Sequence, residues 1–513
     1  MRKVYGIGET VYDIIFAQDQ PQRAVPGGST FNSLITLGRC GLHPTMVTET
    51  GDDHVGRLIV GFMAANGVAT DFVTVNPGTK THISLAFLDE NNDAHYQFYK
   101  DHASASVEHR FPDFQADDIV LFGSFFAINP VIRSYTHEFL QRAHDAGCIL
   151  YYDINFRAAH IGDLPRVREN IEENMRLATI VRGSTEDFGC LYGEADAETI
   201  YRERIAPLCP NFICTAGADG ITSFFAGHRQ QFAVTPISTV STIGAGDNFN
   251  AGIAHSLMRQ GVTLSHLQAP TAELVAALIA NGQQFSAEVC QSIENYVGKP
   301  FARHLMTEEV FSHKAFLFDL DGVIIDTEGQ YQEFWGAIGQ EFLPEIPDFA
   351  TRIKGSTLVA IHEKYFPETT VRAEVDRRLV AYEDNMRYPL FPGAQEFIEV
   401  ARAKSVPCAI VTSSNQQKMA SLATQQPHLT AAFDHVFTAE DAGRGKPYPD
   451  CYLRAAERLG VKAEECVVFE DSINGLKAAR ASGAFVVGLT TTHSADIVSQ
   501  YADIVICTLS DLL

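Results

Sequence analysis

Short apolar runs alternate with segments of helical periodicity along most of the chain. The clearest runs are four or five residues long and span 119–122, 148–152, 212–215, 315–318, 408–411 and 466–469. Such runs are typical of strands buried on both faces, and the amphipathic segments between them are typical of crossover helices. The pattern therefore predicts βαβ units with parallel sheets, an α/β fold, in both halves of the chain.

The pattern also predicts where the two halves meet. Residues 271–288 have the periodicity of a helix, Gly298-Lys299-Pro300 follows, and a new strand-like run begins at Lys314. No internal repeat relates the halves. We predict two unlike domains, 1–297 and 314–513, joined by a linker at 298–313.

Composition narrows the class of protein. The chain has 513 residues, enough for each half to bury its own core. A formal net charge of -24 disfavours binding to nucleic acid, and no apolar stretch is long enough to span a bilayer. The first ten residues lack a signal-peptide pattern, and ten scattered Cys suggest reduced thiols. We expect a cytoplasmic protein that binds neither nucleic acid nor membrane; a homodimer stays open.

Small residues open a predicted helix in the first half. Gly244, Ala245 and Gly246 let backbone N–H groups face one point at the helix N-terminus, which makes an anion site. Asp247 follows directly. A carboxylate at this rim is poorly placed to bind phosphate but well placed to take a proton from an attacking hydroxyl. Taken alone, the motif is also typical of a helix N-cap Asp after a glycine turn.

Other motifs accompany it in a fixed order. They are Gly6-x-Gly8-Glu9, Asp13, Gly27-Gly28, Asn32, Asp-Ile-Asn-Phe-Arg at 153–157 and Thr-Ala-Gly-Ala-Asp-Gly at 215–220. Over about residues 1–297 the set resembles the PfkB, or ribokinase-like, carbohydrate kinases, and the 153–157 segment is similar to that of the fructokinase and ketodeoxygluconate kinase branches. The resemblance implies a ribokinase-like α/β/α sandwich, a small β lid from 80–99, and ATP as co-substrate.

The resemblance also implies roles for single residues. Asp247 would be the catalytic base, and the amides of 244–247 would hold the developing charge on the phosphoryl group. Residues expected to contact the substrate are Asp13, Gly28, Asn32 and Arg157. Residues expected on the nucleotide side are Thr215, Gly217 and Gly220.

Two positions depart from the family pattern. The usual Asn-x-x-Glu, which helps to organise magnesium, is Ser184-Thr185-Glu186-Asp187 here, so Asp187 is the expected acid and Glu186 the alternative. The Asp that usually opens the glycine motif is Ser241, which puts monovalent-cation activation in doubt. No P-loop motif occurs.

The second half opens with paired carboxylates. The apolar run 315–318 ends in Asp319-Leu320-Asp321-Gly322, and alternation along a strand points both carboxylates to one side. The carboxyl end of a parallel strand is where open α/β sheets bind ligands. Neighbouring carboxylates repel unless a cation offsets them, which predicts magnesium. Taken alone, Asp-x-Asp is also typical of a solvated turn.

Three further elements accompany the pair. Thr412-Ser413-Ser414 ends a second apolar run, Lys446 lies in the segment 445–450, and Glu470-Asp471 ends a third run. Over nearly all of 314–513 this ordered set resembles the haloacid dehalogenase superfamily, in its β-phosphoglucomutase-like branch. The resemblance implies a Rossmann-like domain with an inserted helical cap at about 330–392.

The second resemblance assigns roles too. Asp319 would be the nucleophile that forms an aspartyl phosphate, and Asp321 would protonate the leaving oxygen and then activate water. Residues expected to bind the phosphorylated substrate are Thr412, Ser413 and Lys446. Residues expected to hold Mg²⁺ are Asp319, Asp321 through its carbonyl, and Asp471, with Glu470 in support.

Two cap positions bear on the reaction type. β-Phosphoglucomutases carry a His after the first motif and an Arg in the cap, where this chain has Tyr331 and Leu358. Both departures favour hydrolysis of a sugar phosphate. The sequence thus predicts a bifunctional sugar kinase and phosphatase. Three alternatives stay open. The second half could be a mutase, the first half could be a nucleoside kinase, or either half could be a sugar sensor without catalytic activity.

Overall fold

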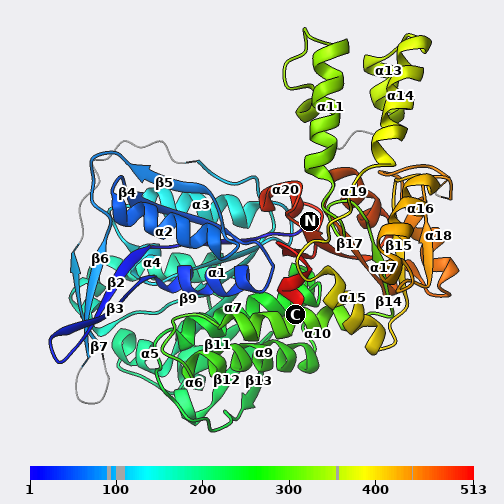
Figure 1. The fold of residues 1–513 in the computed structure, drawn as a ribbon. Helices are drawn as coiled ribbons and strands as arrows, with labels where there is room; N and C mark the ends of the chain where they lie inside the picture. Colours follow the sequence, from blue (N-terminus) through cyan, green and yellow to red (C-terminus); the bar gives the residue numbers. More distant parts are fainter. Residues whose placement is uncertain (89–93, 100–109, 354–357, 442) are drawn as a thin grey trace. The chain divides into compact units, whose positions relative to one another are not determined.

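The computed structural model describes residues 1–88, 94–99, 110–353, 358–441 and 443–513 (Figure 1). The chain divides into two compact units, Arg2–Ala302 and Arg303–Leu513 together with Met1. We call them the kinase unit and the phosphatase unit, after the resemblances above. None of the helices in the described parts of the chain combines the length and apolar character that crossing a membrane requires.

A nine-stranded sheet forms the centre of the kinase unit. Neighbours are parallel from β5 through β11, while β12 and β13 pair antiparallel. In spatial order the strands are β13 (His228–Phe232), β12 (Ile221–Phe225), β11 (Phe212–Thr215), β10 (Ile180–Ser184), β9 (Ile149–Asp153), β8 (Ile119–Gly123), β1 (Val4–Ile7), β4 (Thr45–Gly51) and β5 (Ala69–Asn76).

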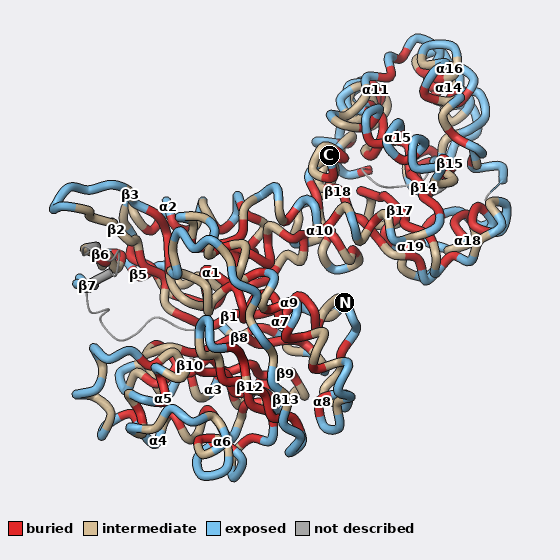
Figure 2. Tube along the Cα trace, turned by 90° about the horizontal axis from the view of Figure 1, so that it is seen from below, coloured by how far each residue is buried: buried red, intermediate tan, exposed pale blue. Residues whose placement is uncertain are grey.

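Helices cover both faces of this sheet because neighbouring strand residues point to opposite sides. On β9, Tyr152 joins a core cluster with Phe139 of α3 (Arg133–Asp145) and Phe188 of α5 (Thr185–Tyr192). The next side chain, Tyr151, instead hydrogen-bonds Asn250 of α7 (Ala245–Arg259). The remaining helices of the unit are α1 (Ser29–Arg39), α2 (His54–Ala65), α4 (Leu164–Leu177), α6 (Ala197–Ile200), α8 (Leu264–Gln268) and α9 (Ala272–Cys290). Figure 2 shows that the buried stretches of the chain coincide largely with the strands of the sheet.

A second, four-stranded sheet provides the small β lid. Its order is β3 (Gln20–Gly27), β2 (Val11–Ala17), β6 (Ile83–Leu88) and β7 (Ala94–Tyr99). The predicted lid segment 80–99 supplies β6 and β7, and its residues 89–93 lie outside the described residues. The architecture is the ribokinase-like sandwich with a lid that the sequence predicted.

The phosphatase unit contains a six-stranded sheet in which all neighbours are parallel. On β14, Phe316 and Phe318 enter one apolar cluster, while Ala315 and Leu317 enter another, so both faces are covered. The strands in spatial order are β16 (His435–Phe437), β15 (Cys408–Val411), β14 (Ala315–Phe318), β17 (Cys466–Glu470), β18 (Phe485–Leu489) and β19 (Ile504–Ile506). The helices of this core are α15 (Ala394–Ala403), α16 (Gln416–Gln425), α17 (Pro427–Thr430), α18 (Asp450–Arg458), α19 (Ile473–Ser482) and α20 (Ala495–Val498).

A helical cap is inserted between β14 and β15 (Figure 1). It consists of α11 (Glu328–Phe342), α12 (Phe349–Arg352), α13 (Leu358–Tyr365) and α14 (Thr369–Glu383). Trp335, Val375 and Leu379 belong to an apolar cluster of its own. Where the chain leaves and re-enters the core, the N–H of Asp326 donates to the carbonyl oxygen of Pro389 over 2.8 Å.

The predicted linker contains helix α10 (Lys299–Phe311). The two compact units divide within this helix, between Ala302 and Arg303. Near its start, the Phe301 ring packs edge-on against Phe285 of α9. Near its end, Met306 and Val310 belong to the apolar cluster of the phosphatase unit. The domain limits themselves stay a prediction.

Two candidate active sites

The first candidate site lies where helix α7 begins. Gly244 precedes the helix with a φ of 77°, and a Cβ there would lie 2.6 Å from the carbonyl oxygen of Asn295, so the position favours glycine. Ala245 is the first helical residue, and its N–H donates to the carbonyl oxygen of Thr242 over 3.2 Å. This turn places Asp247 in the first turn of α7. The positive end of the helix dipole therefore lies beside this carboxylate.

The start of α1 meets the start of α7 at Asp247. Ser29 Oγ donates to Oδ1 of Asp247 over 2.7 Å, and Asn32 Nδ2 donates to Oδ2 over 2.8 Å. Ser33 Oγ donates to the Asp247 carbonyl oxygen over 2.7 Å. Burial raises the pKa of Asp247, and the bonds from Ser29 and Asn32 oppose that rise. Gly28 precedes α1 with a φ of 131°, where a Cβ would lie 2.3 Å from the Glu9 carbonyl oxygen.

Asp13 on β2 belongs to the same group of residues. Ser84 donates a hydrogen bond to its Oδ1, and a Cβ on Gly27 would lie 2.2 Å from its Oδ2. Burial raises the pKa of Asp13 to about 6, and the carboxylates of Glu9 and Asp247 add to this rise. The structure therefore brings Asp13 near Asp247, together with the Glu9 side chain, whose Oε1 lies 3.0 Å from Nδ1 of His82. The sequence placed Glu9 in a glycine motif without giving it a role, and it did not point to His82.

A buried charge network lies behind the glycine motif. Arg182 Nη1 lies 3.0 and 3.1 Å from the two carboxylate oxygens of Asp153, and Asn250 Nδ2 donates to Asp153 over 2.7 Å. Burial opposes the charged form of Arg182, but the charge and hydrogen bond of Asp153, together with Tyr151 and Asp187, outweigh burial and raise the arginine pKa. A Cβ on Gly246 would lie 3.1 Å from Arg182 Nη1, so this guanidinium borders the glycine motif. The sequence prediction missed Arg182, although a charge within the apolar strand Ile180–Ser184 was a signal.

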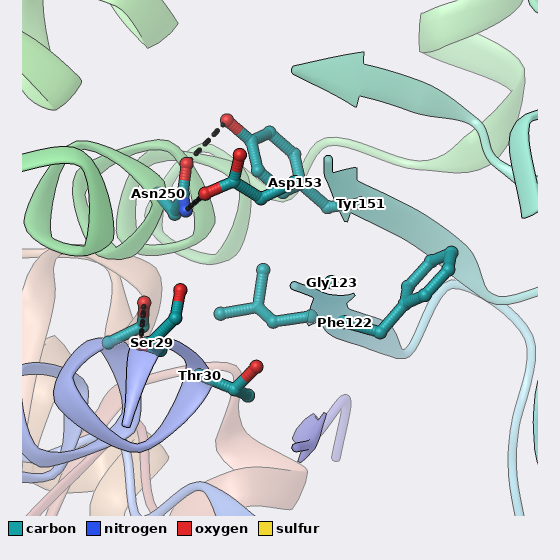
Figure 3. A pocket seen from close by; sticks show the side chains of 9 residues that line it. Ser29, Thr30, Phe122, Gly123, Tyr151, Asp153 and Asn250 are labelled. Atoms are coloured by element: carbon teal, nitrogen blue, oxygen red, sulfur yellow. Dashed lines mark hydrogen bonds between the residues drawn. The ribbon is translucent and has the colours of Figure 1, made fainter. Parts of the chain in front are cut away.

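A small pocket is lined by residues of α1, β8, β9 and α7. Figure 3 shows Ser29 and Thr30 of α1 facing Asp153 and Asn250 across it. Gly123, at the end of β8, lies between them along the wall. The pocket therefore lies among polar groups at the carboxyl ends of the parallel strands, where open α/β sheets bind ligands.

The predicted nucleotide-side residues follow β10 and β11. Thr215 Oγ1 accepts a hydrogen bond from Arg182 over 2.8 Å, while Gly217 and Gly220 have positive φ in the turn after β11. Asp187 is buried and caps α5: its Oδ2 accepts from the N–H and the Oγ of Ser184, both at 2.7 Å.

Two other predicted kinase residues are exposed. Glu186, the alternative to Asp187, has an exposed side chain. Arg157 is exposed as well, and its charge lowers the pKa of Asp247. Arg157 therefore lies within electrostatic range of the candidate base.

The second candidate site lies at the carboxyl end of β14. Lys446 Nζ lies 2.5 Å from Oδ1 of Asp319, 2.6 Å from Oε1 of Glu470 and 3.2 Å from the Val411 carbonyl oxygen. All these side chains are buried. Burial raises the pKa of Asp319 to about 7, Lys446 opposes the rise and Glu470 adds to it. The lysine therefore joins the predicted nucleophile to the predicted metal-binding acids.

Three of the carboxylates fit a divalent cation. One oxygen each from Asp319, Glu470 and Asp471 lie within 4.8 Å of one another. Burial raises the pKa of Asp471 well above its usual value, and the charges of Glu470 and Asp319 add to this rise. Oδ1 of Asp471 is buried and has no hydrogen-bond partner among the described residues. Hard oxygen donors with one such oxygen unpaired suit Mg²⁺.

The three hydroxyl residues after β15, Thr412, Ser413 and Ser414, have different surroundings. Thr412 is buried, and its Oγ1 accepts from the N–H of Ser414 over 3.0 Å. The side chain of Ser413 is exposed. Ser414, to which the prediction gave no role, donates its hydroxyl to Oδ2 of Asp321 over 3.0 Å.

Asp321 has a further partner that the sequence did not reveal. Lys418 Nζ on α16 lies 2.6 and 2.8 Å from its two carboxylate oxygens, and Thr327 donates to Oδ1. Burial would raise the pKa of Asp321, but the charge and hydrogen bonds of Lys418, together with the hydrogen bonds from Thr327 and Ser414, outweigh burial and lower it. The two cap positions that bear on the reaction type also have definite surroundings. The hydroxyl of Tyr331 donates to Oε1 of Glu383 over 2.9 Å, and Leu358 is 39% exposed. Residues 354–357 of the cap lie outside the described residues.

Comparison with known families identifies both units. The pattern of the pfkB family carbohydrate kinases matches residues 1–293, and that of the haloacid dehalogenase-like hydrolases matches residues 313–483. The chain belongs to the pfkB family of carbohydrate kinases and carries a haloacid dehalogenase-like hydrolase domain in its second half. It is therefore an enzyme that combines a sugar kinase domain with a phosphatase domain.

Single relatives agree with this division. The second half is 31% identical over 207 residues to validoxylamine A 7'-phosphate phosphatase of Streptomyces hygroscopicus subsp. limoneus, which is 39% of this chain and 96% of the relative. It is 30% identical over 240 residues to β-phosphoglucomutase of Mycobacterium tuberculosis, covering 39% and 91%. The first half is 24% identical over 269 residues to fructokinase of Vibrio alginolyticus, covering 52% and 87%.

A solved structure agrees with the fold of the kinase unit. Aminoimidazole riboside kinase from Salmonella enterica, complexed with aminoimidazole riboside and an ATP analogue, superposes with a TM-score of 0.52 and 23% identity. The match covers 60% of this chain and 99% of that one. At this identity the likeness shows the fold alone.

Proposed function

We propose that the kinase unit transfers the γ-phosphoryl group of ATP to a hydroxyl of a sugar. The observation that carries this proposal is Asp247, held by Ser29 and Asn32 in the first turn of a helix that opens on glycines. Asp247 takes the hydroxyl proton as the sugar oxygen attacks. The helix N-terminus and the nearby guanidinium of Arg182 stabilise the charge on the phosphoryl group.

The remaining predicted residues surround this step. The sugar is oriented by Asp13, Gly28 and Asn32. Asn32 donates a hydrogen bond to Asp247, and Asp13, on the lid strand β2, is close enough for the charge of Asp247 to raise its pKa. Arg157 adds positive charge near Asp247. Residues proposed for the nucleotide side are Thr215, Gly217, Gly220 and Asp187.

We propose that the phosphatase unit hydrolyses a sugar phosphate through an aspartyl phosphate on Asp319. Its supporting observation is the contact of Lys446 with both Asp319 and Glu470. Lys446 holds the nucleophile and offsets the charge of the incoming phosphate. Thr412 and Ser413 contact the phosphorylated substrate, and Asp321 moves the proton, first to the leaving oxygen and then from water.

Magnesium would be held by Asp319, Asp471 and the carbonyl of Asp321, with Glu470 behind them. When bound, it offsets charge that would otherwise repel the substrate phosphate. Hydrolysis is favoured over a mutase because the Tyr331 hydroxyl is engaged with Glu383 and the exposed Leu358 offers no cationic group. We also propose a cytoplasmic protein: all ten Cys are free thiols in the structure, which suits a reducing compartment.

One pair of variants of the full chain tests both proposals. We expect Asp247→Ala to lower sugar-dependent ADP release by about 10²–10⁴-fold and to leave phosphate release intact. We expect Asp319→Asn to abolish phosphate release and to leave sugar-dependent ADP release intact. EDTA should abolish phosphate release from the wild type. Each variant is the folding control for the other. Full ADP release from Asp247→Ala, or metal-independent phosphate release, would contradict the respective proposal.

The same assays define the substrates. ADP release is measured with neutral sugars, sugar acids and ribosides, which separates a sugar kinase from a nucleoside kinase. Phosphate release and isomer formation are measured with sugar phosphates. Isomerisation without phosphate release would show a mutase in place of the proposed phosphatase.

A further inference from the structure

Lys418 has no role in the phosphoryl chemistry derived above, yet it is one of the most buried charged residues of the phosphatase unit. Its side chain, on α16, is 2% exposed, and its ammonium contacts both carboxylate oxygens of Asp321. Lysine is almost never fully buried unless it is paired. The Asp321 side chain is 33% exposed, so the pair is buried on the lysine side only. A buried ammonium needs its counter-charge, and this need holds the Asp321 carboxylate against Lys418.

The other contacts of Asp321 complete this constraint. Thr327 donates to Oδ1 and Ser414 donates to Oδ2. Each carboxylate oxygen therefore has the lysine on one side and a hydroxyl on the other. This set of donors fixes the rotation of the carboxylate plane, which decides where a proton can be taken up.

The cap holds the lysine from the other side. The Lys418 ammonium lies 4.8 Å from the centre of the Tyr331 ring, at a distance typical of a cation–π contact. The Tyr331 hydroxyl donates to Glu383, which is 8% exposed. Burial raises the pKa of Glu383, whereas the Tyr331 bond and the charge of Lys418 lower it. Tyr331 and Glu383 belong to α11 and α14, two of the cap helices that Figure 1 shows rising from the core.

We propose that Lys418 is a positioning residue for Asp321 in the phosphatase reaction, and that the Tyr331–Glu383 pair of the cap holds Lys418 in place. The proposal rests on the proposed function of Asp319 and Asp321. In the hydrolytic step, water forms a bond to phosphorus, the bond between phosphorus and Asp319 breaks, and the water proton passes to Asp321. A carboxylate that Lys418 no longer orients accepts this proton poorly.

A substrate with a good leaving group separates the two halves of the reaction. p-Nitrophenolate leaves without protonation, so formation of the aspartyl phosphate depends little on Asp321, whereas its hydrolysis still needs the base. In such a two-step reaction kcat/KM reports formation, and a slow second step lowers kcat and KM together. Loss of a positioning residue thus has a kinetic signature that a folding defect lacks.

The test compares full-length Lys418→Met and Lys418→Arg with an exposed control, Lys477→Met, on p-nitrophenyl phosphate with Mg²⁺. We expect Lys418→Met to lower kcat about 10–100-fold, with KM falling in parallel and kcat/KM within about threefold of wild type. The phosphorylated fraction on Asp319 should rise, and Lys418→Arg should recover part of kcat. Unchanged kcat, or a fall of kcat/KM as large as that of kcat, overturns the proposal. Absence of any Asp319 adduct in both the wild type and Lys418→Met, even when beryllofluoride is used to trap the nucleophile, instead overturns the proposed function.

The cap contribution is tested with Glu383→Gln in two backgrounds. We expect a fall of kcat of about 3–10-fold in the wild type and no further fall in Lys418→Met, since effects that run through one residue do not add. An equal fall in both backgrounds shows that Glu383 acts independently and overturns this part. If Lys418→Met fails to fold, judged by loss of its thermal transition, Lys418→Arg and Glu383→Gln carry the same comparison of kcat with kcat/KM.

Discussion

Oδ2 of Asp247 accepts a hydrogen bond of 2.8 Å from the side-chain amide of Asn32. The other end of that amide, Oδ1 of Asn32, is buried and has no partner in the described parts of the chain. An unpaired buried acceptor costs free energy, so a substrate hydroxyl that donates to it would gain more than a typical surface hydrogen bond. We therefore predict that Asn32 holds the base with its amide nitrogen and a substrate hydroxyl with its amide oxygen.

We predict that Asn32→Ala raises KM for the sugar about 3–10-fold, as expected for one lost hydrogen bond, and lowers kcat as well. Asn32→Asp should be worse, because a second carboxylate against Asp247 would raise the pKa of the pair. Steady-state ADP release measures both effects, and the phosphatase activity of the same protein is the control. A KM that is unchanged in both variants would remove Asn32 from the sugar site.

The pH dependence of the kinase should report Asp13. Burial raises its pKa to about 6, and it must be ionised to accept hydroxyl protons from a sugar. We therefore predict that kcat/KM for the sugar falls about tenfold per pH unit below pH 6. In Asp13→Asn the value should be low at every pH and the step near pH 6 should disappear. A step that persists in this variant would assign the titration to another group, such as Asp247.

Magnesium should matter most for the stability of the phosphatase unit near neutral pH. The pKa of Asp319 is raised from 3.8 to about 7 by burial, so the folded state binds an extra proton between these values. The stability of the metal-free unit then falls as pH rises through this window. Mg²⁺ binds the deprotonated carboxylates and should restore it.

Calorimetry of the full chain in EDTA and in Mg²⁺ measures this effect. We expect the EDTA transition of the phosphatase unit to move to lower temperature from pH 5 to 7.5. Adding Mg²⁺ should raise the transition temperature of the phosphatase unit more at pH 7.5 than at pH 5. Asp319→Asn, which lacks one of the titrating groups, should weaken the first trend, while Asp471, whose pKa is also raised, keeps part of it. A transition in EDTA that rises with pH would contradict the assignment.

The strands were predictable because their runs are buried on both faces. The runs 315–318 and 408–411 coincide with β14 and β15, since little but a central parallel strand leaves four consecutive apolar residues buried. Acids and glycines at the ends of such strands were equally predictable, because the carboxyl ends of parallel strands share one edge.

The partners of those acids were harder to predict. Lys418 lies 97 residues from Asp321 along the chain, on a helix whose pattern resembles any amphipathic surface helix. Its burial follows from the packing of the cap and not from local sequence. Ser413 and Ser414 show the same limit on a smaller scale, because the turn geometry alone decides which hydroxyl faces Asp321.

Helix α10 should be needed by the phosphatase unit when that unit is separated from the kinase unit. Val310 is fully buried in the phosphatase cluster, and Thr307 Oγ1 donates to the Leu512 carbonyl oxygen over 2.9 Å. We predict that a fragment starting at Gly298 is active, whereas one starting at Ser312 loses about 2–5 kcal/mol of unfolding free energy. Urea unfolding of the two fragments measures the difference. Equal midpoints would show that α10 contributes nothing to this unit.

The final prediction concerns the two activities together. Asp247 and Asp319 each keep their charged and hydrogen-bonding partners, so both sites retain their chemistry. If both acted on one ester, the chain would only hydrolyse ATP, and covalent linkage would worsen this by raising the local product concentration. We therefore predict that they act on different esters or different positions. With limiting sugar and excess ATP, the wild type and Asp319→Asn should yield the same stoichiometric sugar phosphate. Continuous ADP release by the wild type without sugar phosphate, arrested after one equivalent in Asp319→Asn, would show that both sites share one ester.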